Sequence, residues 1–525
     1  MQESNMEKGS RKQIRKAAVI LFWLTVWQAA AAWTDNQILL AGPLQVLDSF
    51  IENIMHPDFF PVILSSLTRI GAGFFLAFFA GAVLGAVSCR LSLVEELLSP
   101  VISVLKSIPV ASFVVLLLIW FGSGRLSFFI SFLIVFPNVY VNTVAGVRST
   151  DAKLLEMARV FEMGSGRKFF YLYRPALMPY LDSCLKISLG MSWKSGVAAE
   201  IIGLPQSSLG ERLYMSKIYL DTAGLFAWTI TIVLVSFLFE KVVLWCFRKF
   251  AEWRPYPVSG PGECFRAGLR PVRRKRHGRI CPGRHGGANP KRGFGNVSVG
   301  DTLGNKDEIG GKSRHNSGTE TGRGSEPEIR MLHIEKIYDG KPVLSDFNLT
   351  METGGRYLLM APSGAGKTTL LRILTGLEQA DRGGIQGMAG HIGMVFQEDR
   401  LCEEYDAVCN IMLGMCRQGL EESGLTGGSM IEYIRTQAAG ILPDDCLMKP
   451  VSDLSGGMRR RVALLRAVLS GADVLILDEP FTGLDEGNRI RCAEYLKEQL
   501  QGRTLLVTTH REEDAALLQG KKIYF

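Results

Sequence analysis

The sequence predicts two folded halves, an all-α membrane domain over residues 1–250 and an α/β domain over residues 329–525. Three observations lead to this prediction. Apolar runs long enough to cross a bilayer, which requires about 20 residues, are confined to residues 17–247 of the 525. Residues 251–328 are rich in Gly, Pro, Ser and charge. From Ile329 onward, short β-rich runs, predicted to be strands at 357–360, 392–396, 474–477 and 504–508, alternate with amphipathic helical patterns, which is typical of an α/β fold.

Six apolar segments in the first half are predicted to be membrane-spanning helices: 17–33, 63–88, 97–121, 127–147, 182–203 and 222–247. The first could instead be a cleaved signal peptide, because Ala30, Ala31 and Ala32 resemble a cleavage site. A membrane anchor is favoured because five further spans follow.

The basic residues orient these spans. Lys and Arg crowd the first 16 residues and the loop 148–180, whereas the loop 34–60 contains neither. Positive loops remain on the cytoplasmic side. The sequence therefore predicts a multi-pass protein of the cell membrane, in contact with lipid, whose two ends and whose loop 148–180 lie in the cytoplasm.

Residues 251–328 are predicted to form a flexible basic linker. The stretch from Arg248 to Glu328 holds seventeen Lys and Arg against eight Asp and Glu, and it has too few aliphatic residues to bury a core. A basic segment after a membrane helix suits an anionic lipid surface. No nucleic-acid motif accompanies the charge, so nucleic-acid binding is not predicted.

A phosphate-binding loop is predicted between the strand 357–360 and the helix 368–375, where residues 361–369 read APSGAGKTT. Backbone N–H groups of such a loop cradle phosphates at a helix N-terminus. The residues predicted to bind ATP here are Ser363, Gly364, Gly366, Lys367, Thr368 and Thr369. Lys367 would reach the β- and γ-phosphates and Thr368 would ligate Mg²⁺. The pattern's first Gly is replaced by Ala361, which the loop can accept if its φ is negative.

Two carboxylates end a second apolar strand. Residues 474–479 read VLILDE. Asp478 is predicted to hold Mg²⁺, directly or through water, and Glu479 to polarise the attacking water as the general base.

A third motif, LSGGM at 454–458, begins the predicted helix 458–469. Ser455, Gly456 and Gly457 would form a second anion-binding helix start. One domain rarely needs two such starts, so the second is predicted to serve the ATP of another copy. The chain is therefore expected to be a homodimer.

Together these motifs resemble the ATP-binding cassette family of P-loop NTPases over residues 330–525. The resemblance implies that Gln397, in VFQE, senses Mg²⁺ and contacts the permease. It implies that Asp485, in GLD, lies in a dimer-crossing loop and that His510, in TTH, contacts the γ-phosphate. It also implies that Tyr338 stacks on adenine, although a core tyrosine is the alternative.

The loop 148–180 resembles the cytoplasmic coupling helix of bacterial binding-protein-dependent importers. Glu156, Ala158 and Pro175 match that pattern, whereas Met157 and Arg174 depart from it. A short helix with a small residue can seat closely in a groove of the ATPase. Glu156 and Ala158 are thus expected to couple the two halves, and an ordinary charged loop is the alternative.

The whole first half, residues 15–247, resembles the permeases of the nitrate/sulfonate/taurine importer branch, on KSIP at 106–109, WFG at 120–122 and AAEIIG at 198–203. The resemblance implies an ATP-hydrolysing importer that needs a separate substrate-binding protein and carries a small anionic solute such as sulfonate, taurine or nitrate. Lys106 and Lys194, inside predicted spans, would suit an anion. The alternative is that Lys106 snorkels to the inner surface and that Lys194 pairs with Glu200 or a backbone carbonyl oxygen. The alternatives are an exporter of the same family and, because of Ala361, a non-hydrolytic nucleotide-regulated membrane protein.

Overall fold

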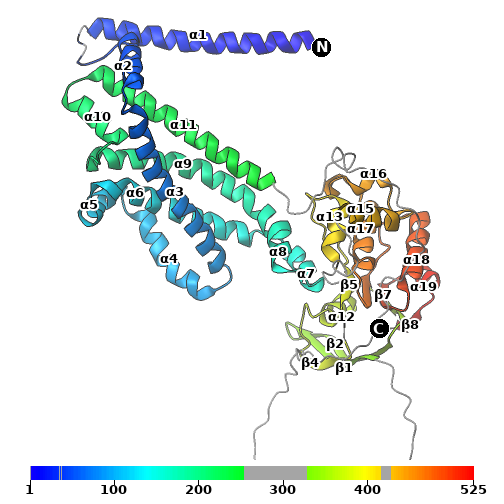
Figure 1. The fold of residues 1–525 in the computed structure, drawn as a ribbon. Coiled ribbons are helices and arrows are strands. Elements are labelled where there is room, and N and C mark those ends of the chain that lie inside the picture. The colour runs from blue at the N-terminus through cyan, green and yellow to red at the C-terminus, as the bar shows by residue number, and fades with distance from the viewer. Residues whose placement is uncertain are drawn as a thin grey trace, which may run out of the picture. The chain divides into compact units, whose positions relative to one another are not determined.

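The computed structural model describes residues 2–34, 36, 38–252, 328–362, 364–388, 390–415 and 427–524. It divides into two units (Figure 1). The first comprises Met1–Leu155 and Gly164–Pro255, and the second comprises Glu156–Met163 and Tyr256–Phe525. Almost all of the predicted linker lies outside the described residues, so its flexibility and boundaries stay predictions.

The first unit is built of helices, which confirms the all-α prediction. They are α1 (Gln2–Thr34), α2 (Pro43–Met55), α3 (Phe59–Ser88), α4 (Ser92–Ser107), α5 (Val110–Phe121), α6 (Ser123–Arg148), the first part of α7 (Ala152–Val160), α8 (Ser165–Lys168), the π-helix Phe169–Tyr173, α9 (Arg174–Gly203), α10 (Leu209–Ile218) and α11 (Thr222–Glu252).

Three of these helices are long and apolar enough to cross a membrane, counting only the described residues: Phe59–Ser88, Ser123–Arg148 and Thr222–Ala251. They contain three of the six predicted spans. The bent pair α4 and α5 would be a fourth crossing if it counts as one span. The predicted spans 17–33 and 182–203 lie within α1 and α9, and their crossing of the membrane stays a prediction.

The predicted span 97–121 is not a single helix, and its crossing of the membrane stays a prediction. The helix breaks between Ser107 and Val110, where the direction of the chain bends by 106° from α4 to α5. Pro109 explains the break, because proline disfavours helical backbone in the residue before it. Ile108 is accordingly extended, with ψ 130°. Apolar residues lie on both sides of Lys106 and Ser107, so hydropathy averaged over a window gives no sign of the break.

Helices α3, α6 and α9 pack into the core of the first unit. A Cβ at Gly73 of α3 would lie 2.2 Å from the carbonyl oxygen of Phe128, so only glycine permits this approach of α3 to α6. Ser131 of α6 joins the three helices: its hydroxyl donates to the carbonyl oxygen of Ile70 at 3.0 Å and lies 2.6 Å from the hydroxyl of Ser192 on α9.

The second unit contains two sheets. The strands are β1 (Glu328–Tyr338), β2 (Lys341–Glu352), β3 (Arg356–Met360), β4 (Arg382–Gln386), β5 (Ile392–Val395), β6 (Val474–Asp478), β7 (Thr504–Thr509) and β8 (Lys521–Tyr524). An antiparallel sheet has the order β2-β1-β4, and a parallel sheet has the order β5-β6-β7-β3-β8. The four predicted strands are β3, β5, β6 and β7, which confirms the α/β prediction. The antiparallel sheet was not predicted.

Helices cover the parallel sheet (Figure 1). They are α12 (Lys367–Leu374), α13 (Ala407–Gly414), α15 (Gly427–Ala438), α16 (Asp444–Leu447), the 3₁₀ turn Val451–Asp453, α17 (Gly456–Val468), α18 (Glu486–Leu500) and α19 (Glu512–Leu518). Strands β6 and β7 are buried along their whole length, as expected for a parallel sheet covered on both faces.

The topology of this sheet positions the predicted site. Strands β6, β7 and β3 are neighbours and run parallel. Their carboxyl ends therefore lie at one edge, where the loop Ala361–Gly366 follows β3, Glu479 follows β6 and His510 follows β7.

Candidate nucleotide site and the Glu156 ion pairs

The loop after β3 has the backbone that a phosphate cradle needs. Gly364 and Gly366 have φ of 83° and 97°, a region that residues with a Cβ rarely adopt. Ala361 is not among the residues with positive φ, so it meets the condition under which alanine can replace the usual glycine. Ser363 lies outside the described residues. The loop thus directs the chain from β3 into the N-terminus of α12.

Lys367, the first residue of α12, is buried and points back at this loop. Its Nζ donates to the carbonyl oxygens of Ala361 at 2.6 Å and Pro362 at 3.0 Å. The ammonium is therefore held inside the curve of the loop, where it can pair with an anion that enters.

Asp478 ends β6 almost completely buried, with 2% of its surface exposed. The hydroxyl of Thr508 donates to Oδ1 at 2.6 Å and that of Thr368 to Oδ2 at 3.1 Å. Burial raises the pKa of Asp478, and these two hydrogen bonds oppose the rise. Hydroxyl and carboxylate oxygens are the ligands that Mg²⁺ prefers. The described residues contain no cluster of three or more metal-binding side chains, so a cation here would depend on phosphate oxygens.

Glu479 follows with left-handed backbone, φ 47°. A non-glycine residue in this region is strained, and such strain clusters at functional sites. Its N–H donates to the carbonyl oxygen of Thr508 at 3.1 Å. One carboxylate oxygen lies 3.4 Å from Nδ1 of His510, which is half exposed. The two side chains face each other from the ends of β6 and β7.

The LSGGM segment begins α17. The hydroxyl of Ser455 accepts from the N–H of Met458 at 3.3 Å, and Gly456 has open space beside it. A Cβ on Gly457 would meet Gly483 and Leu484, in the turn before Asp485. Asp485 in turn caps α18 by accepting from the N–H of Asn488 at 3.4 Å. This is a second open helix N-terminus in the same unit.

Gln397 and Tyr338 are exposed side chains in the structure. The carbonyl oxygen of Gln397 accepts from Arg460 at 3.2 Å. Tyr338 ends β1, and its hydroxyl donates to Glu378. Burial and the Glu378 carboxylate raise the pKa of Tyr338, whereas a hydrogen bond with Thr369 of α12 lowers it. Tyr338 therefore lies beside the helix that follows the phosphate loop.

Arg460 is a residue of this site that the sequence did not reveal. It lies in α17 and is 4% exposed. Its guanidinium donates to carbonyl oxygens at the ends of two strands: Phe396 at 2.6 Å, Gln397 at 3.2 Å, Asp478 at 2.7 Å, Glu479 at 2.6 Å and Pro480 at 3.1 Å. In the sequence it is the middle of three consecutive arginines, a run that normally indicates a solvated surface.

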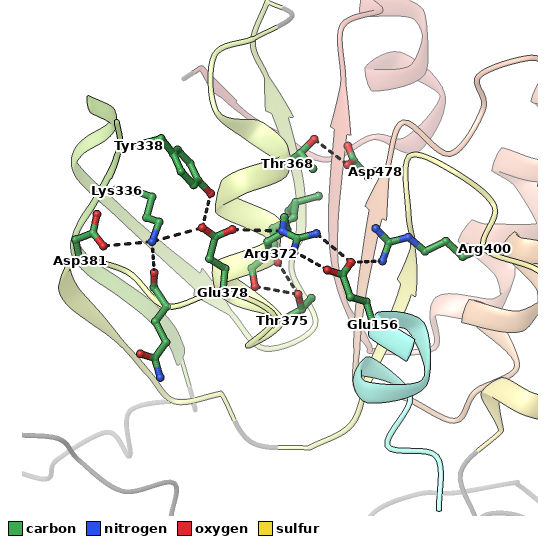
Figure 2. A network of polar contacts seen from close by, with 12 residues as sticks. Glu156, Lys336, Tyr338, Thr368, Arg372, Thr375, Glu378, Asp381, Arg400 and Asp478 are labelled. Atoms are coloured by element: carbon green, nitrogen blue, oxygen red, sulfur yellow. Dashed lines mark hydrogen bonds and ion pairs between the residues drawn. The ribbon is translucent and has the colours of Figure 1, made fainter. Parts of the chain in front are cut away.

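Glu156 forms the centre of an ion-pair cluster in the second unit (Figure 2). Arg372 of α12 donates to both its carboxylate oxygens, at 2.7 and 3.0 Å, and Arg400 donates at 2.7 Å. The hydrogen bond from Arg372 is the main cause that lowers the pKa of Glu156. The pairing is therefore complete above the ordinary carboxyl pKa of 4.5 and is lost only as pH falls through the lowered value.

The rest of the Glu156–Met163 segment packs against the same unit. Ala158 is fully buried, as expected for a small residue that seats closely. The guanidinium of Arg466 lies 5.3 Å from the ring centre of Phe161 and donates to the carbonyl oxygens of Arg400 and Asp399 at 2.7 and 2.8 Å. Burial lowers the pKa of Arg466 to about 10. Sequence reasoning missed Arg372, Arg400 and Arg466, because nothing local distinguishes them from surface arginines.

Comparison with known proteins identifies both units. Residues 344–482 match the family model of the ABC transporter, and residues 53–251 match that of the binding-protein-dependent transport system inner membrane component. The chain is 39% identical over 204 residues to an aliphatic sulfonates import ATP-binding protein of Rhodococcus jostii (strain RHA1), covering 37% of this chain and 77% of that protein. The chain belongs to the ABC transporter family.

Two further matches concern the ATPase half of this ABC transporter. A taurine import ATP-binding protein of Escherichia coli O6:K15:H31 (strain 536 / UPEC) is 32% identical over 199 residues, 36% of this chain and 76% of that protein. A solved dimeric structure of a bacterial ABC transporter cassette is 25% identical, covers 38% of this chain and 94% of that one, and has a TM-score of 0.33.

The predicted fusion of a permease with an ATPase is confirmed by the two family matches. The protein is a multi-pass membrane protein whose second unit binds ATP in the cytoplasm and is an ATPase coupled to transport. The match of residues 53–251 to a binding-protein-dependent permease supports the importer prediction over the exporter alternative.

Replacement of Arg460 by lysine should destabilise the second unit. A buried acceptor left unpaired costs about 1–3 kcal/mol, and a lysine ammonium cannot reach all the carbonyl oxygens that the guanidinium holds. We expect the Arg460→Lys ABC transporter in detergent to melt lower by about 4 °C or more, since about 1 kcal/mol corresponds to about 2–4 °C in a unit of this size.

Arg459→Lys is the matched control. Arg459 is the preceding residue on the same helix, but its side chain is 30% exposed, so water can replace its bonds to Val451, Ser452 and Glu403. Equal melting temperatures for the two variants would show that the buried contacts of Arg460 contribute nothing special.

Proposed function

We propose that this ABC transporter imports a small anionic solute of the sulfonate or taurine class, delivered by a separate binding protein, and that ATP hydrolysis at the second unit drives the import. The observation that carries the proposal is that Arg372, five residues after Lys367 on α12, pairs with Glu156. One short helix thus joins the candidate phosphate site to the segment that follows α6. Nitrate is a further candidate.

The substrate class is supported by two independent observations. The relatives above are named for aliphatic sulfonates and taurine. In addition, Lys194 on α9 is exposed and has no ion pair within the described part of the chain. Lys186, two turns earlier, pairs with Asp182 at 2.5 Å. An unpaired lysine within a predicted span would attract an anion.

We assign the nucleotide-site roles as follows. The backbone of Ser363, Gly364 and Gly366 and the side chains of Lys367 and Thr369 bind the phosphates, while the ring of Tyr338 stacks on adenine. Thr368, Gln397 and Asp478 would hold Mg²⁺, which would neutralise phosphate charge when bound. Glu479 accepts the proton of the attacking water, and His510 contacts the γ-phosphate. The 3.4 Å approach of Glu479 to His510 supports their joint action.

We further propose that the transporter is a homodimer with two shared sites. A Cβ at Gly456, at the start of α17, would meet no atom of the described residues within 4 Å, which leaves room there for the phosphates of a partner's ATP. In a two-fold dimer, each phosphate loop would face the partner's Ser455, and Asp485 would lie at the crossing.

Glu156 and Ala158 are proposed to transmit the work of the ATPase. Ala158 allows close seating and Glu156 supplies the charge that Arg372 and Arg400 hold. A change in the position of α12 would thereby reach the segment that is continuous with α6.

Glu479→Gln tests the catalytic assignment. The amide is nearly the same shape but cannot accept the proton, so we expect ATP binding to be retained and hydrolysis to slow by about 10²-fold or more, as for loss of a general base. Lys367→Ala should instead weaken ATP binding itself. Phosphate release and nucleotide binding by the purified transporter measure both effects. Near-normal hydrolysis by the Glu479→Gln chain would contradict the assignment of Glu479 as the general base.

A mixture of two defective chains tests the shared sites. We expect Lys367→Ala and Ser455→Arg chains each to trap little nucleotide alone. In a mixed dimer one site would carry both defects and the other would be intact, so trapping should rise towards one nucleotide per mixed dimer. Trapping no greater than in either variant alone would contradict sharing between chains.

A further inference from the structure

We propose that Glu378 is a positioning residue that relays the presence of the nucleotide base from Tyr338 to Arg372, and so to Glu156. The inference rests on the proposed function, since it takes Tyr338 as the residue that contacts adenine. It adds a route by which the nucleotide base, and not only the phosphates, affects the Glu156–Met163 segment.

The two oxygens of Glu378 have different partners. Oε1 accepts from the hydroxyl of Tyr338, and Oε2 accepts from Nε of Arg372 at 3.3 Å. The side chain is 19% exposed. Figure 2 shows Glu378 between Tyr338 and Arg372. A rotation of this carboxylate that improves one contact must therefore disturb the other.

Arg372 is shared between two carboxylates. Its Nε faces Glu378, while its two terminal nitrogens donate to Glu156 at 3.0 and 2.7 Å. The backbone limits other arrangements, because the N–H groups of Leu377 and Glu378 both donate to the carbonyl oxygen of Arg372, at 2.9 and 3.2 Å. The guanidinium is planar and forked, so a shift at Nε is passed to its terminal nitrogens.

Lys336 ties the other end of the relay to the ring of Tyr338. Its Nζ lies 5.4 Å from the ring centre, 3.4 Å from Oε1 of Glu378 and 3.2 Å from Asp381. An adenine that stacks on Tyr338 would take the opposite face of the ring. Clamped between base and ammonium, the ring would hold its hydroxyl on Glu378 more firmly.

The order of the charges indicates that six side chains act together. Lys336, Arg372 and Arg400 are interleaved with Asp381, Glu378 and Glu156 in an unbroken chain of contacts (Figure 2). Three positive and three negative groups alternate. A change at one end can therefore propagate without leaving an unpaired charge.

Hydrogen–deuterium exchange of the full-length transporter in lipid nanodiscs tests the relay, in a Glu479→Gln background that slows hydrolysis. The probes are ATP and inorganic tripolyphosphate, which lacks the base, each at a concentration shown to saturate binding. We expect ATP to slow amide exchange in residues 152–163 about fivefold or more relative to tripolyphosphate, the lower range of coupling between sites.

Replacing Glu378 should remove this difference. In Glu378→Ala we expect the ATP effect on residues 152–163 to fall to the tripolyphosphate level while ATP still binds. Glu378→Gln, which keeps shape and loses charge, should give an intermediate effect. Glu335→Gln is the matched control: it removes a carboxylate of β1 whose ion-pair partner is Arg382 at 3.8 Å, and it should leave the ATP effect intact.

Two results would overturn the relay. One is an undiminished ATP effect in both Glu378 variants, and the other is equal protection by ATP and tripolyphosphate in the parent chain. If the parent chain bound ATP no more tightly than tripolyphosphate, the assignment of Tyr338 in the proposed function would be contradicted instead, so the two failures can be told apart.

Discussion

The proposed coupling depends on the ion pairs that Arg372 and Arg400 form with Glu156. All three side chains are partly withdrawn from water, with exposures of 29%, 12% and 25%. Ion pairs in such places compensate the loss of hydration only when their geometry is good. Here both oxygens of the carboxylate receive charge-assisted bonds from Arg372, the arrangement in which arginine binds carboxylates most strongly. Removing Glu156 would take this carboxylate from both guanidinium groups and leave Arg372 paired with Glu378.

The chemistry of the second unit depends on the parallel sheet. Groups far apart in the sequence follow adjacent strands, so Lys367, Asp478 and His510 reach one edge without any local signal that they belong together. Arg460 links two strands at this edge, since its guanidinium donates to carbonyl oxygens at the ends of both β5 and β6. The backbone that carries Glu479 is thereby held in its strained conformation.

The sequence allowed prediction of what is encoded locally. The loop around Gly364, Gly366 and Lys367, the strand that ends at Asp478 and the helix after Ser455 each have a pattern within ten residues, and the structure has these elements. Ala158 is buried, as expected for a small residue that lets a short helix pack closely. The residues' chemical roles remain proposals. The break at Pro109 was missed because hydropathy averages over it, although the proline itself was a usable signal.

The partners of Glu156 could not be predicted because they depend on distant contacts. Arg372 and Arg400 are separated from Glu156 by more than 200 residues. The proposed role of Glu378 depends on its contacts with Tyr338 and Arg372. A single sequence records neither relation. The same is true of Arg460, which is buried although it lies in a run of three arginines.

The most direct test of the account is to compare solute uptake with ATP hydrolysis in a Glu156→Lys transporter. Membrane vesicles that contain the parent transporter are first supplied with the binding protein and with taurine, alkane sulfonates or nitrate. This screen identifies a solute that the parent transporter accumulates. The account predicts that Glu156→Lys still hydrolyses ATP but no longer accumulates this solute, whereas Glu162→Lys, which alters an exposed neighbour paired with His391, behaves as the parent. Accumulation by the Glu156→Lys transporter at the parent's rate per ATP would contradict it.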